Sequence, residues 1–545
     1  MKKFFYLIIV FLIFLFVTAC TPGINPESSS SGGSSKERSI PQLPHTSSDW
    51  LFVMYMDADN NLNDELWIDI TYVQLALDSL LQNINTPKQG YPSVKVVMLW
   101  DGENQQDALL LRNTRLHPRG EIYELGPMDS DTADLITDRN NAGEFLNTYW
   151  MLSRYSKRLT DYAPWLSYEP DMGDVSTLSN FLSWVNTNYS ADNIVLCLSD
   201  HGSGTEYENN SGGINNSPSR RNSRSLCADD TSETSKLLTA TDVKNAINHS
   251  GLHPNIIWMD CCLQGNVETA YILKGCADYL VTSANVSYSN SHYNIISSLT
   301  SRNIDPQELG RTIVKCYAEK YKYNIRNVDD DDDRTSYDIV LTQAQYDLSE
   351  LKQMNLLNKI NLLSMAIQRE PVTTRMAIFN NFLKQDRTNI NNCKGMAYSG
   401  TYTVLNDIGY LCKQLSDSTD LGISTETKNA ANNLMDSLND VIITSWIGTR
   451  TEHTTEPASV NLVYSKNLSD LNYRHTNQLN DGSFGLTIVS HSFTHDPGYF
   501  PDTQYGTSAE YTTFYKRIFP IYENYSNVTG YSHEWGNLLS FWHRN

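Results

Sequence analysis

Runs of apolar residues alternate with amphipathic stretches through the first half of the chain. Each run is long enough for a strand buried on both faces of a sheet, and the runs cover residues 50–56, 94–100, 194–198, 256–259 and 279–283. Residues 176–188 instead place Leu178, Phe181 and Val185 at helical spacing. Strands that alternate with helices predict right-handed crossovers and a mainly parallel central sheet, which is an α/β fold.

The pattern changes beyond residue 338. Long helical stretches are predicted for residues 344–384 and 403–446, and two late strands for residues 459–464 and 484–489. We therefore expect an α/β domain over residues 49–340. A mostly helical C-terminal region should follow at 341–545, with its late strands completing the fold.

The first 48 residues have the pattern of an exported, lipid-anchored protein. Lys2 and Lys3 precede an apolar run that ends near residue 17, which is too short for a stable transmembrane helix. Small residues come directly before Cys20, as in a bacterial lipobox, so residues 1–19 are predicted to be a signal peptide and Cys20 the lipidated residue. Residues 20–48 are rich in Ser, Gly and Pro, which predicts a disordered tether. We expect attachment to the membrane through this lipid, in the bacterial cell envelope, at the outer membrane or the cell surface.

The charge of the chain limits its partners. The 545 residues carry a formal net charge of −21 and a pI near 4.9. Nucleic-acid binding needs a basic surface, so a nucleic-acid partner is excluded, and cationic ligands suit the chain better. We expect the protein to be a monomer.

Two of the predicted buried strands end in residues that can do chemistry. The run at 194–198 leads into Ser199, Asp200, His201 and Gly202, and the run at 256–259 leads into Asp260, Cys261 and Cys262. The carboxyl ends of parallel strands share one edge of the sheet, where α/β proteins place their sites. A thiol and an imidazole at this edge are typical of a nucleophile and its base. The backbone N–H groups of Gly202 and Cys262 are candidates for an oxyanion hole.

Four segments resemble the clostripain family of cysteine peptidases, which belongs to the caspase-like clan. They are WLFVMYMDADNNL at 50–62, DMGDVSTLSNFLSWV at 171–185, NIVLCLSDHGSG at 193–204, and DCCLQGNVETAYIL with ADYLVTS at 260–283. Weaker similarity continues through GSFGLTIVS and HEWGNLLSF near the C-terminus. The segments occur in the family's order and cover most of the chain after the tether.

The resemblance implies a caspase-like three-layer α/β sandwich and an endopeptidase with a His201/Cys262 dyad. It also implies cleavage after Arg, less readily Lys, of protein or peptide substrates. The family's cysteine follows an aspartate by two positions, which selects Cys262 over Cys261 and places Asp260 in the pocket for the basic P1 side chain. An ionised carboxylate binds a guanidinium through two hydrogen bonds, so Arg should be preferred.

The sequence departs from the family pattern at three positions near the predicted site. Cys261 replaces the usual alanine, Gln264 a common methionine, and Asn285 a frequent acid. The last substitution leaves the second acidic partner of the P1 side chain unlocated.

Family members often mature by cutting themselves between the histidine and the cysteine. Residues 206–225 form a long polar stretch that contains Arg220, Arg221 and Arg224. We expect self-cleavage after one of these arginines.

Two alternatives stay open at the level of sequence. No cofactor is required by the predicted chemistry, but some clostripain relatives need calcium, and the run 329–333 is five consecutive aspartates. Such a run is more often a solvated loop, and Asp57 and Asp59 read as helix-cap and turn residues rather than metal ligands. The second alternative is a lipid-anchored surface protein that binds glycan or peptide without catalysis, which the 32 tyrosines and 10 tryptophans suggest.

Overall fold

The structure is a computed structural model. It describes residues 42–83, 86–102, 120–130, 154–167, 169–202, 226–227, 237–285, 287–321, 340–383, 398–399, 404–450, 460–466, 468, 485–491, 534–535, 538 and 541–542.

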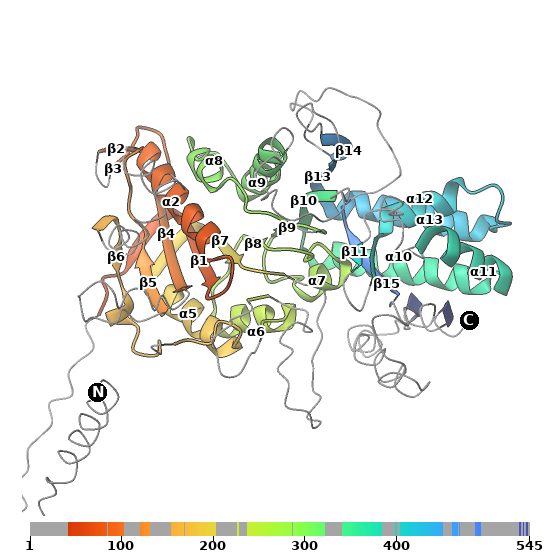
Figure 1. The fold of residues 1–545 in the computed structure, drawn as a ribbon, viewed down its shortest axis with the longest axis horizontal. Coiled ribbons are helices and arrows are strands. Elements are labelled where there is room, and N and C mark those ends of the chain that lie inside the picture. The colour runs from red at the N-terminus through yellow and green to blue at the C-terminus, as the bar shows by residue number, and fades with distance from the viewer. Residues whose placement is uncertain are drawn as a thin grey trace, which may run out of the picture. The chain divides into compact units, whose positions relative to one another are not determined.

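Five parallel strands form the centre of the main sheet (Figure 1). Among the described residues the order of the whole sheet is β14-β13-β10-β9-β8-β7-β1-β4-β5-β6. The parallel strands are β1 (Thr46–Ala58), β4 (Val94–Gly102), β7 (Tyr189–Ser199), β8 (Ile256–Asp260) and β9 (Tyr279–Thr282). Their sequences are the apolar runs from which a parallel sheet was predicted. The strand at 50–56 is longer than predicted, because the polar residues 46–48, expected in the tether, pair with the start of β7.

Antiparallel strands extend this centre on both sides. On one side lie β5 (Gly120–Glu124) and β6 (Lys157–Arg158), and on the other β10 (Val340–Asp347), β13 (Ile442–Arg450) and β14 (Val460–Lys466). The sheet therefore continues across residue 340 into the C-terminal region. A short hairpin of β2 (Leu81–Asn83) and β3 (Thr86–Pro87) lies apart from it.

Helices cover both faces of the sheet (Figure 1). One face carries α2 (Asn63–Leu80), α8 (His292–Ser297) and α9 (Pro306–Tyr321), and the other carries α5 (Val175–Asn188), α6 (Ala240–Ser250) and the short α7 (Val267–Ile272). Side chains alternate between the two cores along β1, where Phe52 and Met54 face the first layer and Val53 and Tyr55 the second. This arrangement confirms the predicted three-layer α/β sandwich.

Polar side chains set the starts of three of these helices. Asp174 caps α5 through the N–H of Ser176, and Asn266 caps α7 through that of Thr269. Thr239 and Asp242 form a reciprocal capping box at the start of α6. Each cap satisfies N–H groups that a helix cannot pair internally.

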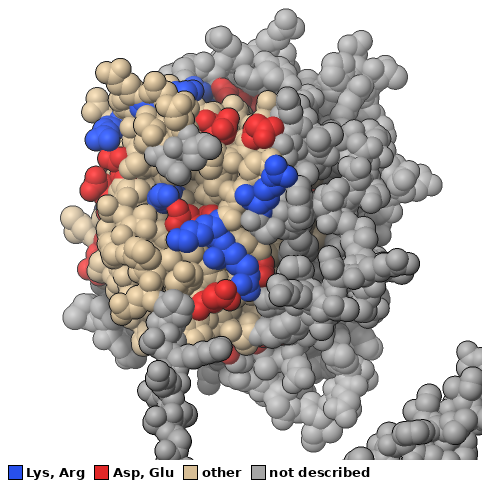
Figure 2. Space-filling view, turned by 90° about the vertical axis from the view of Figure 1, so that its left-hand side faces the viewer, with Lys and Arg blue, Asp and Glu red and all other residues tan. Residues whose placement is uncertain are grey.

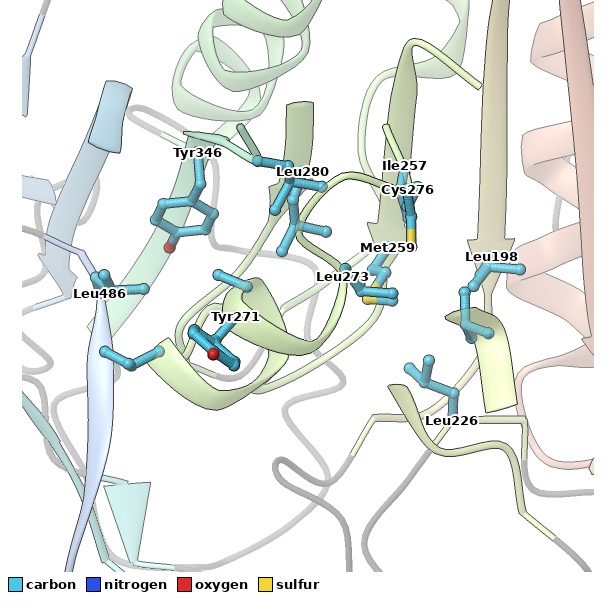
Figure 3. Close-up of a cluster of buried hydrophobic side chains, with 14 of the residues drawn as sticks. Leu198, Leu226, Ile257, Met259, Tyr271, Leu273, Cys276, Leu280, Tyr346 and Leu486 are labelled. Atoms are coloured by element: carbon cyan, nitrogen blue, oxygen red, sulfur yellow. The ribbon is translucent and has the colours of Figure 1, made fainter. Parts of the chain in front are cut away.

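The C-terminal region is helical between its strands, as predicted. It contains α10 (Glu350–Arg369), α11 (Val372–Ile378), a single π-helical turn (Phe379–Leu383), α12 (Ile408–Asp417) and α13 (Thr425–Val441). A small sheet joins β11 (Tyr398–Ser399), β12 (Val404–Asp407) and β15 (Thr487–His491). Figure 3 shows how Tyr346 of β10 and Leu486 pack with Tyr271 and Leu280, so the two regions share one core.

Three parts of the predicted long helices are wrong. Residues 344–347 belong to β10, residues 404–407 form β12, and residues 442–446 begin β13. Ala344 and Gln345 suit a helix by propensity, but they are buried and pair with both β9 and β13. Tertiary pairing overrides weak local preference at these positions.

Acidic and basic side chains are interspersed on the face at the left-hand end of Figure 1, which Figure 2 shows from the front. Near that end, Arg158 of β6 pairs with Glu121 of β5 and with Asp161, and Lys95 of β4 pairs with Glu124 of β5. The described surface there is therefore not a patch of one sign. Within the described ranges, no helix combines the length and the apolar character needed to cross a bilayer.

Candidate active site

The pairing of β7 with β8 brings the predicted histidine and cysteine to the same level of the sheet. Ser199 pairs with Asp260 at the ends of these parallel strands, so His201 and Cys262 each follow the same level of the sheet by two residues. The two segments that follow these strands also lie in close contact. A Cβ atom on Gly202 would lie only 2.1 Å from the carbonyl oxygen of Cys262. Only glycine fits at position 202. Because it has no side chain, the segments that follow β7 and β8 can pack directly against each other.

A tight turn follows Cys262 and is held from several sides. Leu263 adopts a left-handed backbone with φ of 64°, which is unusual for a large side chain, and its N–H donates to the carbonyl of Asn285 at 3.0 Å. The N–H of Gly265 donates to Ser283 at 2.7 Å, and its carbonyl accepts from the N–H of Thr487 at 3.0 Å. A strained turn fixed this way presents the cysteine at a defined position.

The two adjacent cysteines have different environments. Cys261 is 4% exposed and packs in the core shared by α5, α6 and α7, and its burial raises the pKa of the thiol well above the usual range. Cys262 is only half-buried. Cys262 is therefore the more exposed of the two residues.

Backbone groups surround the Cys262 sulfur. The N–H of Ser287 lies 3.2 Å from Sγ, and the carbonyl of the same residue lies 3.5 Å from it. Burial raises the pKa of this thiol, and hydrogen bonds from the N–H groups of Ser287 and Gly202 act in the opposite direction. The same N–H of Gly202 is one of the two predicted oxyanion donors.

The imidazole of His201 is exposed and lies next to Asn61, a residue that the sequence analysis did not single out. Nε2 of His201 is 2.8 Å from Oδ1 of Asn61. The neighbouring Asn60 donates to Asp200 at 2.7 Å, which ties the loop after β1 to the loop after β7. β1 and β7 are adjacent parallel strands, so the residues that follow β1 lie near those that follow β7. The polar DADNNL sequence at the end of β1 was therefore the sequence feature that could have pointed to Asn61 as a neighbour of His201.

Asp260 lies in a buried cluster. Its side chain is 4% exposed, and Oδ2 is 3.5 Å from Nε2 of His292. Burial raises the pKa of Asp260 to about 6, although the nearby His292 opposes this shift. The role of Asp260 in binding a P1 side chain stays a prediction.

Several other predicted residues lie outside the described part of the chain. They are Cys20, Arg220, Arg221, Arg224 and the aspartates at 329–333. Gln264 and Asn285, which differ from the family pattern, are both buried beside the turn that follows Cys262, with 2% and 7% exposure.

Two groups of described side chains bring potential metal ligands together. In each group the ligand atoms lie within 4.8 Å of one another, and the groups are Asp57, Asp200, Cys227 and Asp69, Asp260, His292. Calcium binds oxygen ligands, so neither a thiol nor an imidazole in the set fits it. A bound calcium ion stays a prediction from the sequence.

Comparison with known proteins identifies the class to which this fold and site belong. The model of the clostripain family matches residues 54–487, which is most of the chain, and the protein belongs to that family. The resemblance drawn from the four sequence segments is confirmed.

Individual relatives are distant. Clostripain from Hathewaya histolytica is 26% identical over 226 residues, a match that covers 40% of this chain and 34% of the relative. The chain therefore matches about a third of the length of that curated relative. A secreted C11 cysteine protease from Bacteroides thetaiotaomicron, solved with an irreversible peptide inhibitor, is 14% identical with a TM-score of 0.48 and coverage of 87% and 98% of the two chains. An inactive zymogen C11 protease from Parabacteroides distasonis is 12% identical with a TM-score of 0.47 and coverage of 92% and 99%.

Proposed function

We propose that this protein is a cysteine endopeptidase in which Cys262 is the nucleophile and His201 the base. The register of β7 against β8 carries the proposal, because it sets both residues at one edge of the sheet with Gly202 packed against Cys262. Membership of the clostripain family supports the same chemistry. The greater exposure of Cys262, compared with the enclosed Cys261, supports its choice as the nucleophile.

In the proposed reaction, His201 takes the proton from the Cys262 thiol, and the thiolate attacks the scissile carbonyl carbon. The N–H groups of Gly202 and Cys262 stabilise the oxyanion that forms. His201 then returns the proton to the leaving amine as the peptide C–N bond breaks. Water, deprotonated by His201, hydrolyses the thioester and regenerates the thiol.

Asn61 would set the tautomer of His201. Its Oδ1 accepts a hydrogen bond, so Nε2 carries the hydrogen and Nδ1 carries the lone pair in the neutral ring. A base needs such a lone pair to accept the thiol proton. Asn61 acts through His201 and is a positioning residue.

We further propose that substrates are cut after Arg, less readily Lys, with Asp260 contributing to the preference from its position two residues before Cys262. Activation by self-cleavage within 206–225, at Arg220, Arg221 or Arg224, belongs to the same proposal. So does attachment to the cell envelope through a lipid on Cys20, and action as a monomer. We propose no required cofactor.

Peptides that end in Arg, Lys, Asp or Leu before a reporter group test the activity. We expect release from the Arg peptide to exceed that from Lys, with little release from Asp. Cys262→Ala and His201→Ala should each lower kcat/KM by roughly a thousandfold or more, since they remove the nucleophile and the base. Steady-state kinetics on purified variants measures this.

Cys261→Ala is the matched control, because it removes the adjacent thiol and should keep activity. Full activity in Cys262→Ala with loss in Cys261→Ala would contradict the assignment of the nucleophile. A protein that binds peptide or glycan without catalysis would release no reporter from any peptide.

Asn61→Ala should lower kcat by roughly 10- to 100-fold with little change in KM, because the imidazole loses its fixed orientation. Asn61→Asp should restore part of kcat and move the pH profile of kcat/KM upward, since a carboxylate favours the protonated ring. Asn294→Ala, at an exposed asparagine of α8 that bonds Ser291, is the control. An unchanged kcat and pH profile in Asn61→Ala would remove the positioning role.

Purified protein should contain a new N-terminus directly after Arg220, Arg221 or Arg224, and the Cys262→Ala variant should lack it. Sequencing of the N-termini of both preparations measures the cut. Full activity of a single intact chain would contradict activation by self-cleavage.

A further inference from the structure

Four charged groups gather in the core beneath the predicted nucleophile. Asp69 comes from α2, Asp260 from the end of β8, His292 from the start of α8, and Lys320 from the last turn of α9. The ring of His292 bridges the two carboxylates, with Nδ1 at 3.3 Å from Asp69 and Nε2 at 3.5 Å from Asp260. Side-chain exposure is 0% for His292, 2% for Asp69 and 4% for Asp260.

The two cations offset the two carboxylates. Burial disfavours a charged His292, but the carboxylates of Asp69 and Asp260 raise the pKa of its ring well above the usual range. Burial lowers the pKa of Lys320, and the same two carboxylates counteract this shift. The Lys320 ammonium donates to the carbonyls of Ser289 at 2.6 Å and Asn290 at 3.1 Å. With all four groups ionised, the cluster has no net charge.

The chain segment around residues 287–290 connects this cluster to the reacting sulfur. Ser287 donates its N–H to Sγ of Cys262 at 3.2 Å, and the hydroxyl of Ser289 donates to Asp69 at 2.6 Å. The N–H of Asn290 hydrogen-bonds Asp260. The segment therefore connects the buried carboxylates to the backbone that holds the sulfur, and a substrate side chain bound at Asp260 would meet the charge of the whole cluster.

We propose that Lys320 and His292 are specificity-determining residues that offset the charge of Asp69 and Asp260 and so reduce the preference for a basic P1 side chain. The inference rests on the peptidase activity proposed above. A lone carboxylate attracts a guanidinium strongly in a dry pocket, whereas a carboxylate that already faces cations of its own protein does not. The strength of the basic preference is thus set by residues on α8 and α9.

The ratio of kcat/KM for Arg and Leu peptides tests this, because the ratio does not depend on the amount of folded enzyme. Lys320→Met should raise the ratio at least tenfold over the unmodified enzyme, since it leaves the cluster with a net negative charge. Lys320→Arg keeps the charge and should keep the ratio. Arg311→Met, a loss of the same charge from a more exposed position on α9, is the matched control and should leave the ratio unchanged.

Asp69→Asn is a second variant with the opposite expected effect, because it leaves the cluster with a net positive charge and should lower the ratio. It also tests the inference if Lys320→Met does not fold. A ratio that neither Lys320→Met nor Asp69→Asn moves would overturn the inference while the peptidase proposal stands. If the unmodified enzyme releases no reporter from any peptide, the peptidase proposal fails and the inference falls with it.

Discussion

The parallel pairing of β7 with β8 is the constraint on which the site depends. Hydrogen bonds fix the register up to Ser199 and Asp260, and both strands end at this level of the sheet. His201 and Cys262 are the second residues beyond that point. Gly202 completes the contact because any larger residue would collide with the Cys262 carbonyl. A slip of one residue in this register would turn every side chain of β8 to the other face and shift Cys262 relative to His201.

A second constraint acts on the opposite face of the same strands. Alternation along β8 directs Trp258 and Asp260 into the layer of α2, α8 and α9, while Met259 and Cys261 face the other core. A carboxylate in that layer needs partners, because an unpaired buried charge is strongly unfavourable. Asp260 meets this need through His292, and the same ring holds Asp69 from α2. The chemistry at the sheet edge and the packing of two helices are thus linked through one imidazole.

The strands of the parallel centre could be predicted because each is a continuous apolar run bounded by turn residues. The positions of His201 and Cys262 followed from them, since parallel strands end at one edge. β10 could not be predicted in this way, because its Ala344 and Gln345 become strand residues only through pairing with β9 and β13. Asn61 and Lys320 are far from the cysteine in sequence, and only the packed fold brings Asn61 to the imidazole and Lys320 to the buried carboxylates. No local pattern marks such residues.

The central claim is that Cys262 is a nucleophile whose reactivity depends on His201. A peptidyl chloromethyl ketone that ends in Arg alkylates an activated thiol irreversibly, and peptide mass spectrometry locates the modified sulfur. The account predicts rapid labelling of Cys262 in the unmodified enzyme and labelling at least a hundredfold slower in His201→Ala, in line with the loss of a general base. Labelling of Cys261 in place of Cys262, or equal rates with and without the imidazole, would contradict it.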